Sequence, residues 1–354
     1  MKNIRVLVVD DSALMRRLIT DILSQESKIE VIGTASNGKI ALTKIDQLNP
    51  DIVLLDIEMP EMDGLSMLCE LRKKHNKIPV IIFSSLTTSG AETTLKALNY
   101  GANDWVTKPV NGVSFDENRQ KVSRELIYKI KGLIKPNNQV ISTKLATVKT
   151  PSKSLPGVNR IDIVAIGTST GGPNALKATL PYIPTDFPVP IVIVQHMPAI
   201  FTGILADSLL KNSSIPVSEA KDGDVLLPGH ALIAPGNYHM TIDFQDKHYV
   251  IRLNQDPAEN YCRPAVDVLF RSVAHHFGSH TLGVVMTGMG HDGLKGCDVI
   301  KEKQGQVITQ DEETSVVWGM PGAVTRAGLA DQTLPLGDIG LAIIQRVNRK
   351  RNIL

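Results

Sequence analysis

The chain has 354 residues, of which 42% are hydrophobic and 21% are charged. This length is more than one compact core usually holds, so two domains are expected. The formal net charge of +2 lacks the strong basic surplus of a protein that binds nucleic acid or anionic membranes. The three cysteines, Cys69, Cys262 and Cys297, are too scattered for a disulfide framework or a zinc site.

The N-terminal sequence and the lengths of the apolar runs indicate a cytoplasmic protein. MKNIRVLVVDD passes directly into a strand-like run and lacks the apolar core and cleavage site of a secretory signal. Runs such as IVIV and VIIF are far shorter than the roughly 20 residues that span a bilayer. We therefore expect a protein of the reducing cytoplasm that is not inserted in a membrane.

Residues 1–134 alternate short apolar strands with amphipathic helices. The strand patterns are IRVLVV, EVIGTA, DIVLLDI, PVIIFSS and DWVTK, and Leu14, Leu18 and Ile22 show helical spacing after the first strand. The alternation is typical of a doubly wound parallel sheet, and the pattern predicts five strands and five helices. The active crevice of such a sheet lies outside the carboxyl ends of its strands.

Polar side chains gather at these strand ends. Asp10 and Asp11 end the first strand, Asp56 ends the third, Ser84 ends the fourth and Lys108 follows the fifth. A single aspartate here would be interpreted as a helix cap. Three carboxylates at one edge instead repel one another unless a cation such as Mg²⁺ binds between them. The cation and Lys108 would then offset the charge of a phosphoryl group on Asp56.

The DD pair and the motifs LLDIEMPEMDG, FSS and WVTKP resemble the response-regulator receiver domain, which has a flavodoxin-like fold. The resemblance implies that Asp56 accepts the phosphoryl group and that Asp10, Asp11 and Asp56 hold Mg²⁺. The switch residues that it implies are Ser84, Trp105 and Lys108. Trp105 lies where this family more commonly has tyrosine or phenylalanine.

Residues 135–157 change character and predict a flexible linker. Residues 135–160, KPNNQVISTKLATVKTPSKSLPGVNR, which include this linker, are rich in Ser, Thr, Asn and Pro and contain no aromatic residue. All of its charged residues are basic, so it is either a solvated linker, the interpretation we favour, or a docking surface for an acidic partner.

The third segment, 158–354, alternates strands and helices again. IDIVAIG, PIVIVQH, TLGVVMTGMG and QVITQ are strand patterns, whereas HMTIDF and YVIRLN predict a hairpin. Helices are expected from Pro173, around Phe201–Leu210, over Arg263–Phe277 and near Gly293–Lys303, with a last one before the basic tail. The segment therefore predicts a mostly parallel, doubly wound α/β sheet with an antiparallel hairpin.

Ser169 lies directly after a predicted strand, in a turn rich in glycine. GTSTG fits the G-x-S-x-G pattern, in which glycines allow a sharp turn to expose a serine hydroxyl. The helix expected from Pro173 would place free backbone amides beside that hydroxyl. Such turns more often bind phosphate or merely turn the chain, but GTSTGG lacks the lysine of a P-loop and the spacing of a dinucleotide site.

His196 ends the next strand in VIVQHMP, and Asp292 lies in a loop after a later strand, VVMTGMGHDG. A serine needs a base to become nucleophilic, and the base needs a carboxylate to fix its tautomer. Three parallel strand ends would bring Ser169, His196 and Asp292 over one crevice; the alternative for His196 is a packed or surface histidine. The other histidines considered, interpreted as loop, surface or helix-end residues, are His275, His276, His280 and His291.

The motifs GTSTGG, QHMP, CRPAVDVLF and TGMGHDG together resemble the bacterial chemotaxis methylesterase family, which joins a receiver to a C-terminal hydrolase. The resemblance covers essentially the whole chain. It implies that Ser169 is the nucleophile, His196 the general base and acid, and Asp292 the orienting carboxylate. It also implies an oxyanion-hole amide from Met289 and no cofactor in the catalytic domain.

The same resemblance implies a substrate and partners. The expected enzyme, activated by phosphorylation, removes methyl esters from glutamates of methyl-accepting chemoreceptors with release of methanol. It also deamidates specific glutamines with release of ammonia, and a chemotaxis histidine kinase is the expected phosphodonor. One alternative is a response regulator that binds DNA, which the lack of a helix-turn-helix pattern disfavours. Another is an inactive adaptor of hydrolase ancestry, which the intact Ser/His/Asp set disfavours.

Overall fold

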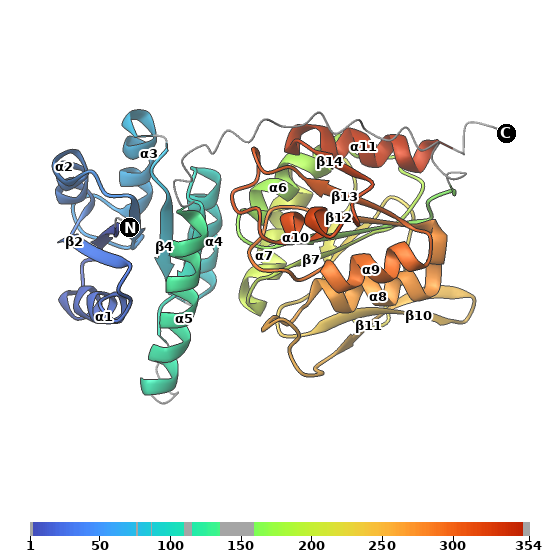
Figure 1. Cartoon of the computed structure of the whole chain (residues 1–354), viewed down its shortest axis with the longest axis horizontal. Coiled ribbons are helices and arrows are strands. Elements are labelled where there is room, and N and C mark those ends of the chain that lie inside the picture. The colour runs from blue at the N-terminus through green and yellow to red at the C-terminus, as the bar shows by residue number, and fades with distance from the viewer. Residues whose placement is uncertain (1–2, 76, 86, 110–114, 135–158, 350–354) are drawn as a thin grey trace.

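The computed structural model describes residues 3–75, 77–85, 87–109, 115–134 and 159–349. The predicted linker, 135–157, lies outside these residues. The described chain forms two separate parallel sheets and one antiparallel hairpin. In Figure 1 the smaller sheet and its helices lie beside the larger sheet, with two long helices between them.

The first sheet is built from the N-terminal part of the chain. Its strands are β1 (Ile4–Val9), β2 (Ile29–Ala35), β3 (Ile52–Leu55), β4 (Val80–Ser84) and β5 (Asp104–Thr107). Its helices are α1 (Ala13–Leu23), α2 (Gly38–Leu48), α3 (Gly64–Lys74), α4 (Thr88–Asn99) and α5 (Phe115–Leu133). The strands are parallel in the order β2-β1-β3-β4-β5, which is the flavodoxin-like order. The predicted five-stranded, doubly wound receiver fold is thus confirmed.

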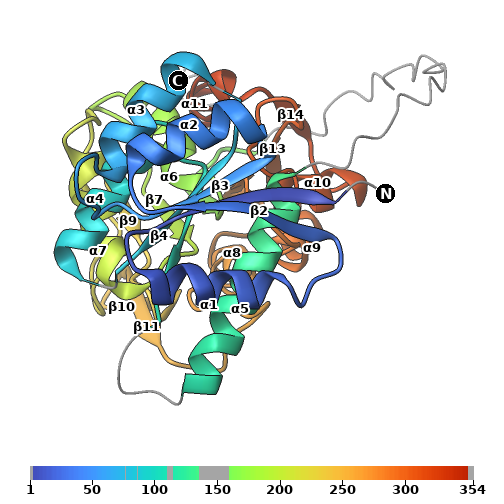
Figure 2. The same cartoon turned by 90° about the vertical axis from the view of Figure 1, so that its left-hand side faces the viewer.

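Both faces of this sheet are covered, which explains why the central strands β1, β3 and β4 are apolar over most of their length. Val6 and Val8 of β1 pack in one apolar cluster with α1 and α5, and Leu7 and Val9 pack in another with α2, α3 and α4. Figure 2 shows α1 and α5 on one side of the sheet and α2 and α3 on the other. The alternation of side chains along β1 therefore fixes which helices cover which face.

Side-chain caps start the first four helices, within three residues of the preceding strand for α1, α2 and α4 and after a longer loop for α3. Each cap accepts a hydrogen bond from a backbone amide of the first turn; the caps are Ser12, Asn37, Asp63 and Thr87. These polar residues satisfy amides that the helix itself cannot pair. They hold the strand-to-helix turns that present the acidic residues at the carboxyl edge.

The second sheet is larger and is also doubly wound. Its strands are β6 (Ile163–Thr168), β7 (Ile191–Gln195), β8 (Val217–Glu219), β9 (Ala231–Ile233), β12 (Thr281–Val285), β13 (Gln306–Gln310) and β14 (Gln332–Leu334). They are parallel in the order β14-β13-β12-β6-β7-β9-β8. The antiparallel hairpin consists of β10 (His239–Gln245) and β11 (His248–Asn254). The predicted mostly parallel sheet with a hairpin is confirmed.

Six α-helices and two short 3₁₀ turns complete the described part of this half. The helices are α6 (Gly172–Thr179), α7 (Ala199–Leu210), α8 (Val266–Phe277), α9 (Leu294–Glu302), α10 (Met320–Arg326) and α11 (Leu336–Asn348). The 3₁₀ turns are η1 (Leu180–Tyr182) and η2 (Gly278–His280). In the part of the chain that is described, no helix has the length and apolar content needed to cross a membrane.

Two details differ from the sequence-based expectation. The helix expected from Arg263 begins only at Val266, with Ala265 extended before it, because a residue that precedes proline is disfavoured in helical conformation and Pro264 follows Arg263. The strand β14 and the helix α10 were not predicted. β14 has only three residues, and α10 has seven that include proline and glycine, so neither carries a strong periodic signal.

Candidate active site

The central strand of the second sheet, β6, lies between β12 and β7. Ser169 follows β6 and His196 follows β7, and the amide of His196 donates to Thr168 O over 3.1 Å. On the other side, the amide of Ser169 donates to Thr287 O, beyond the end of β12, over 3.0 Å. The strand order reverses direction at β6, so a crevice is expected at this edge. The loop after β12 brings Asp292 to the same edge.

Asp292 is held at the centre of a dense set of donors. Its carboxylate is buried and its Oδ2 lies 2.7 Å from His196 Nε2. The other donors are the amides of Val266 at 2.7 Å, Asp267 at 2.9 Å and Gly293 at 3.0 Å, and the side-chain amide of Asn260 at 2.8 Å. Two of these amides open helix α8, and a helix N-terminus attracts negative charge.

These contacts set the protonation of Asp292. Burial alone would raise the pKa of this carboxyl, but the His196 hydrogen bond and charge, with the amides of Asp267 and Val266, lower it to about 2. Asp292 is therefore an ionised acceptor at neutral pH. A buried, ionised carboxylate fixed in this way orients the imidazole and stabilises its protonated form.

The imidazole of His196 has a second contact. Its Nδ1 lies 3.5 Å from the sulfur of Cys262. Burial alone would lower the pKa of His196, but Cys262 and Asp292 outweigh burial and raise it to about 10. The upward shift depends partly on negative charge at the sulfur. Without that contribution the pKa of His196 would be lower, and a larger fraction of the imidazole would be neutral and able to accept a proton at neutral pH.

Sequence reasoning missed the residues that surround this pair. Asn260 bridges two carboxylates, since its side-chain amide donates to Asp292 over 2.8 Å and to Asp267 over 2.9 Å. Burial and the neighbouring Asp292 charge raise the pKa of Asp267. Cys262 and Asp267 stood inside the motif CRPAVDVLF, but no spacing rule joins Asn260 to a residue 32 positions away. Only the tertiary fold identifies these contacts.

The loop Gly288–Gly290 passes beside Ser169. A Cβ atom on Gly288 would lie 2.9 Å from the Ser169 Cβ and would overlap the sulfur of Met320, so glycine is required there. The amide of Gly288 donates to Val317 O over 3.0 Å. The next amide belongs to Met289, whose role as the oxyanion-hole donor stays a prediction.

The competing histidines lie elsewhere. His275 and His276 are in the last turn of α8, and His291 is exposed although it adjoins Asp292 in the chain. His280 lies in a 3₁₀ turn, where its Nδ1 is 2.8 Å from Arg160 O. Their positions agree with their interpretation as surface, loop and helix-end residues.

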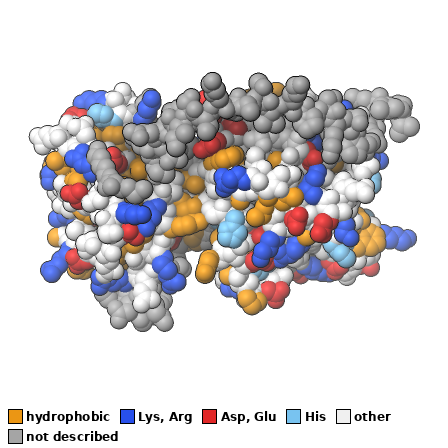
Figure 3. All heavy atoms as spheres, in the orientation of Figure 1, with side chains coloured by type: hydrophobic (Ala, Val, Ile, Leu, Met, Phe, Trp, Pro, Cys, Tyr) orange, Lys and Arg blue, Asp and Glu red, His pale blue; other side chains and the backbone are white. Residues whose placement is uncertain are grey.

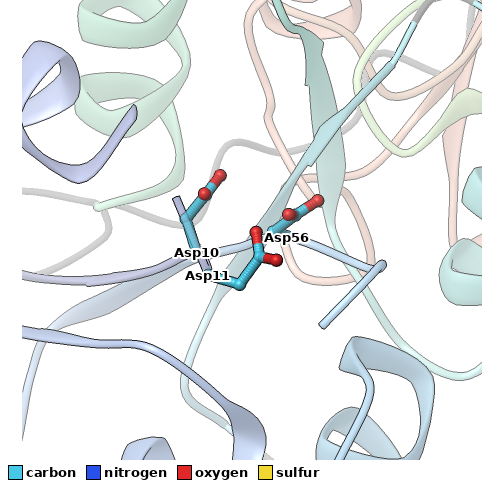
Figure 4. A group of neighbouring side chains, drawn as sticks. All are labelled: Asp10, Asp11 and Asp56. Carbon is cyan, nitrogen blue, oxygen red and sulfur yellow. The ribbon is translucent and has the colours of Figure 1, made fainter. Parts of the chain in front are cut away.

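The acidic residues of the first sheet gather at the ends of β1 and β3, which are neighbours. One carboxylate oxygen from each of Asp10, Asp11 and Asp56 lies within 4.8 Å of the others. Figure 4 shows the three side chains at this edge. Asp10 and Asp56 are buried and Asp11 is exposed. Two of the three carboxylates are therefore interior, and solvent reaches the third.

The charge balance of this cluster favours a bound cation. Lys108 Nζ lies 2.7 Å from Asp56 and 3.1 Å from Asp10 Oδ2. Burial raises the pKa of Asp56, Lys108 partly offsets burial, and the charge of Asp10 raises this pKa further. Asp10 Oδ2 is buried and accepts no hydrogen bond, although Lys108 is near. A divalent cation with a preference for oxygen ligands would satisfy that atom.

Of the predicted switch residues, Ser84 and Lys108 lie beside this cluster and Trp105 lies against the second half of the chain. Ser84 Oγ accepts a hydrogen bond from Thr94 Oγ1 over 2.7 Å and lies 3.2 Å from Gly90 O, both in α4. Asp56, Ser84 and Lys108 line one small cavity. Trp105 is 4% exposed and stacks on Phe201 of α7, with ring centroids 5.6 Å apart. Trp105 thus contacts the second half of the chain directly.

Comparisons with known proteins find a matching family for each half of the chain. Residues 164–343 match the family described as CheB methylesterase, and residues 6–117 match the response regulator receiver domain. A protein-glutamate methylesterase/protein-glutamine glutaminase of Trichodesmium erythraeum is 49% identical over 351 residues, which cover 98% of this chain and 100% of that protein. The chain belongs to the CheB methylesterase family.

Further relatives support the family over the full length. A Nocardioides protein with the same description is 47% identical over 357 residues, covering 99% of this chain and 97% of its own. The solved catalytic domain of Thermotoga maritima CheB methylesterase is 43% identical, with a TM-score of 0.52, and covers 53% of this chain and 99% of that one. The resemblances drawn from the sequence motifs are confirmed at the level of the family.

In this CheB-family chain the receiver packs directly against the catalytic half. Thr170, the residue after Ser169, donates from its hydroxyl to Asp104 Oδ2 of β5 over 2.5 Å. The side chain of Asn174 in α6 donates to Leu98 O of α4 over 3.0 Å. Figure 3 shows apolar side chains along the line where the two halves meet. The receiver therefore contacts the residue next to the predicted nucleophile.

Helix α5 of the receiver lies on the loop Gly288–Gly290. A Cβ atom at Gly132 of α5 would overlap the terminal methyl group of Met289, and one at Gly290 would lie 2.9 Å from the Tyr128 hydroxyl. Burial raises the pKa of the half-exposed Tyr128, and charge at the nearby Cys262 sulfur raises this tyrosine pKa further. The receiver thus lies at the rim of the candidate active site.

A buried ion pair supports this contact. Lys129 Nζ lies 3.1 Å from Asp104 and 3.0 Å from Glu125, and 4.9 Å from the ring centroid of Trp105. Burial alone would lower the pKa of Lys129, but Asp104 and Glu125 outweigh burial and raise it. Asp104 is therefore shared between a lysine of its own half and Thr170 of the other.

Proposed function

We propose that this chain is a receiver-controlled serine esterase that hydrolyses glutamate methyl esters and deamidates specific glutamines on methyl-accepting chemoreceptors. The observation that carries the proposal is the 2.7 Å contact of His196 with the buried, ionised Asp292, one strand end away from Ser169. The names of the full-length relatives supply the two activities. The donor set around Asp292 supplies a reason why the base is held in one orientation.

In the first half of the reaction, Ser169 Oγ attacks the side-chain carbonyl carbon of the substrate. Because Nε2 of His196 is held by Asp292, we assign the serine proton to Nδ1, which lies 3.5 Å from the Cys262 sulfur. The carbonyl oxygen becomes an oxyanion, and the Met289 amide is the proposed donor to it. His196 then gives its proton to the leaving group, so that methanol leaves from an ester or ammonia from an amide.

In the second half, water hydrolyses the glutamyl ester on Ser169. His196 accepts a proton from the water as it attacks, and the proton passes to Ser169 as the ester bond breaks. The product is a free glutamate carboxylate in both reactions. These steps require no cofactor in the catalytic half.

For the receiver, we propose phosphorylation of Asp56 by a chemotaxis histidine kinase. Asp10, Asp11 and Asp56 would hold Mg²⁺, and their clustered oxygen atoms and the Asp10 Oδ2 atom, which accepts no hydrogen bond, fit that ion. Bound Mg²⁺ would supply charge neutralisation during transfer. Lys108 adds a positive charge 2.7 Å from Asp56, and Ser84 is the proposed hydroxyl that responds to the phosphoryl group.

The receiver is proposed to inhibit by covering the active site. Its contacts lie at Thr170, beside Ser169, and at the loop that contains Met289. We assign 1–134 to the receiver, 135–157 to a linker and 158–354 to the catalytic domain. Phosphorylation would shift the population from covered to open, which needs only a few kcal/mol of differential interaction. We place the protein in the cytoplasm, where its kinase and the adapting parts of its receptors would be.

Methanol release from methylated chemoreceptor membranes tests the proposal. The full chain should release methanol, and more of it when a phosphodonor and Mg²⁺ are present. An inactive adaptor would release none under either condition. Retention on DNA, the expectation for the other alternative, would contradict the esterase assignment only if methanol release were also absent.

A further inference from the structure

Tyr261 has the greatest exposure of any large hydrophobic side chain among the described residues, since it is fully exposed. It lies at the tip of the turn Glu259–Cys262. The Cys262 amide donates to Glu259 O over 2.9 Å, and the Glu259 amide donates to Cys262 O over 3.1 Å. Asn260 and Tyr261, between them, have φ angles of 52° and 62°. Two consecutive left-handed residues are typical of a type I′ turn.

Neither the backbone nor packing explains a tyrosine at this position. Asparagine tolerates left-handed backbone conformations, whereas large side chains rarely adopt them. Glycine at 261 would close the same turn without strain. The tyrosine ring is fully exposed, so it contributes no burial to the fold. A contact with another molecule would explain why a tyrosine is present at this position.

The two neighbours of Tyr261 both hold the proposed catalytic groups. Asn260 donates to Asp292 over 2.8 Å, and the sulfur of Cys262 lies 3.5 Å from His196 Nδ1. Adjacent Cα atoms are about 3.8 Å apart, so Tyr261 is fixed at the rim of the crevice. It is exposed even though α5 of the receiver lies on the loop Gly288–Gly290, so the receiver leaves this part of the rim uncovered.

The substrate must bring its own backbone to this rim. A glutamate side chain places its reacting carbonyl carbon about 4 Å from its Cα atom, because three carbon–carbon bonds separate them. When that carbonyl reaches Ser169, the polypeptide that carries it therefore lies at the mouth of the crevice. An exposed tyrosine offers apolar contact area and a hydroxyl at little entropic cost, which is why it is common where polypeptides are recognised.

We propose that Tyr261 is a specificity-determining residue, whose ring packs against the polypeptide segment that carries the reacting glutamate side chain. The inference rests on the proposed esterase function. It assigns to Tyr261 recognition of the protein substrate, and it leaves bond breaking to Ser169, His196 and Asp292. The ring should therefore matter for a protein ester and not for a small ester that lacks the surrounding polypeptide.

The experiment compares two substrates with the full chain. One is methylated chemoreceptor membranes and the other is the γ-methyl ester of N-acetylglutamate. Tyr261→Ala and Tyr261→Gly should lower kcat/KM on the membranes about 10- to 100-fold and change it less than about 2-fold on the small ester. Tyr261→Phe should retain most activity on both. Glycine suits the left-handed conformation, so Tyr261→Gly also controls for strain in the turn.

Phe244→Ala is the matched control, because Phe244 is also an exposed aromatic residue but lies on the hairpin β10–β11. It should leave both activities unchanged. Equal losses on the two substrates would show that Tyr261 supports the site and does not read the polypeptide, which overturns the inference. Unchanged activity on membranes would overturn it as well. Failure of the proposed function is recognised separately, because the wild-type chain would then release no methanol from membranes.

Discussion

Thr170→Val tests whether the receiver inhibits by covering the active site. The Thr170 hydroxyl donates to Asp104 Oδ2 over 2.5 Å, and both side chains are buried between the two halves. Valine has nearly the same shape as threonine but cannot donate a hydrogen bond. The substitution therefore removes one polar contact of the closed arrangement and leaves the packing around it in place.

The expected size of the effect follows from the charge on the acceptor. A hydrogen bond to a charged group contributes roughly 1.5–3 kcal/mol, and in the open state Asp104 would bind water instead. Thr170→Val should therefore shift the equilibrium toward the open state roughly 10- to 150-fold. While the closed state predominates, activity follows the open fraction, so basal methanol release should rise by up to that factor.

The assay is steady-state methanol release from the same receptor membranes without a phosphodonor. It compares the full chain with a fragment that begins at Val158, each with Thr170 and with valine in its place. The fragment lacks Asp104, so any change there measures a direct effect on the neighbouring Ser169. The unsubstituted fragment should be more active than the unphosphorylated full chain, and its rate sets the ceiling for Thr170→Val. Asn99→Ala is the control at the exposed rim, where Lys177 Nζ lies 3.2 Å from Asn99 Oδ1, and should change the rate little.

Two results would refute the reasoning. A full-length Thr170→Val protein that is no faster than its parent, after correction for the change in the fragment, would show that this contact does not hold the closed state. A fragment slower than the unphosphorylated full chain would show that the receiver helps to build the active site or to recruit substrate, and covering would be wrong.

The remaining predictions test the two sites separately. Ser169→Ala should lower methanol release about 10⁴-fold or more with little change in melting temperature; release near the wild-type rate would remove Ser169 from the mechanism. Asp56→Asn should abolish Mg²⁺-dependent labelling by acetyl phosphate, and a persistent label would place the acceptor elsewhere. Cys262→Ala should move the low-pH side of the pH profile of kcat/KM for the small ester to lower pH, because loss of the sulfur lowers the pKa of His196 from about 10. Each fall of one in that pKa raises the neutral fraction of His196 at neutral pH about tenfold. An unchanged profile, or an equal shift in the remote control Cys69→Ala, would exclude this influence.

The sequence was sufficient for the fold because its signals are local. Apolar runs at regular intervals identify parallel strands buried on both faces, and the polar residues that follow them mark the carboxyl edge. The start of α8 was predicted three residues too early, at Arg263 and not Val266. Pro264 disfavours helical backbone at Arg263, and Ala265 is also extended before the helix begins.

The groups that orient the proposed catalytic residues could not be predicted. Asn260 contacts Asp292 across 32 positions, and Cys262 contacts His196 across 66. Both lie in a turn whose sequence resembles an ordinary surface loop. Strand ends predict which side chains share an edge, but loop conformation decides which of them touch. The sequence therefore predicted which side chains lie at the strand ends, but not which turn residues contact them.

The contact between the two halves was hidden for a different reason. Trp105 and Phe201 are buried and stack on each other, but in the sequence each has the pattern of a core residue of its own half. A tryptophan at the predicted switch position has a physical explanation here, since its ring contacts both Phe201 and Lys129. Turning that ring outward would break a contact between the halves. Ser84 and Thr94 join the proposed phosphoryl site to α4, and α4 packs on α6 and α7. A change at Asp56 therefore has a short route, through adjoining elements, to the surface of the receiver that contacts Thr170, beside Ser169.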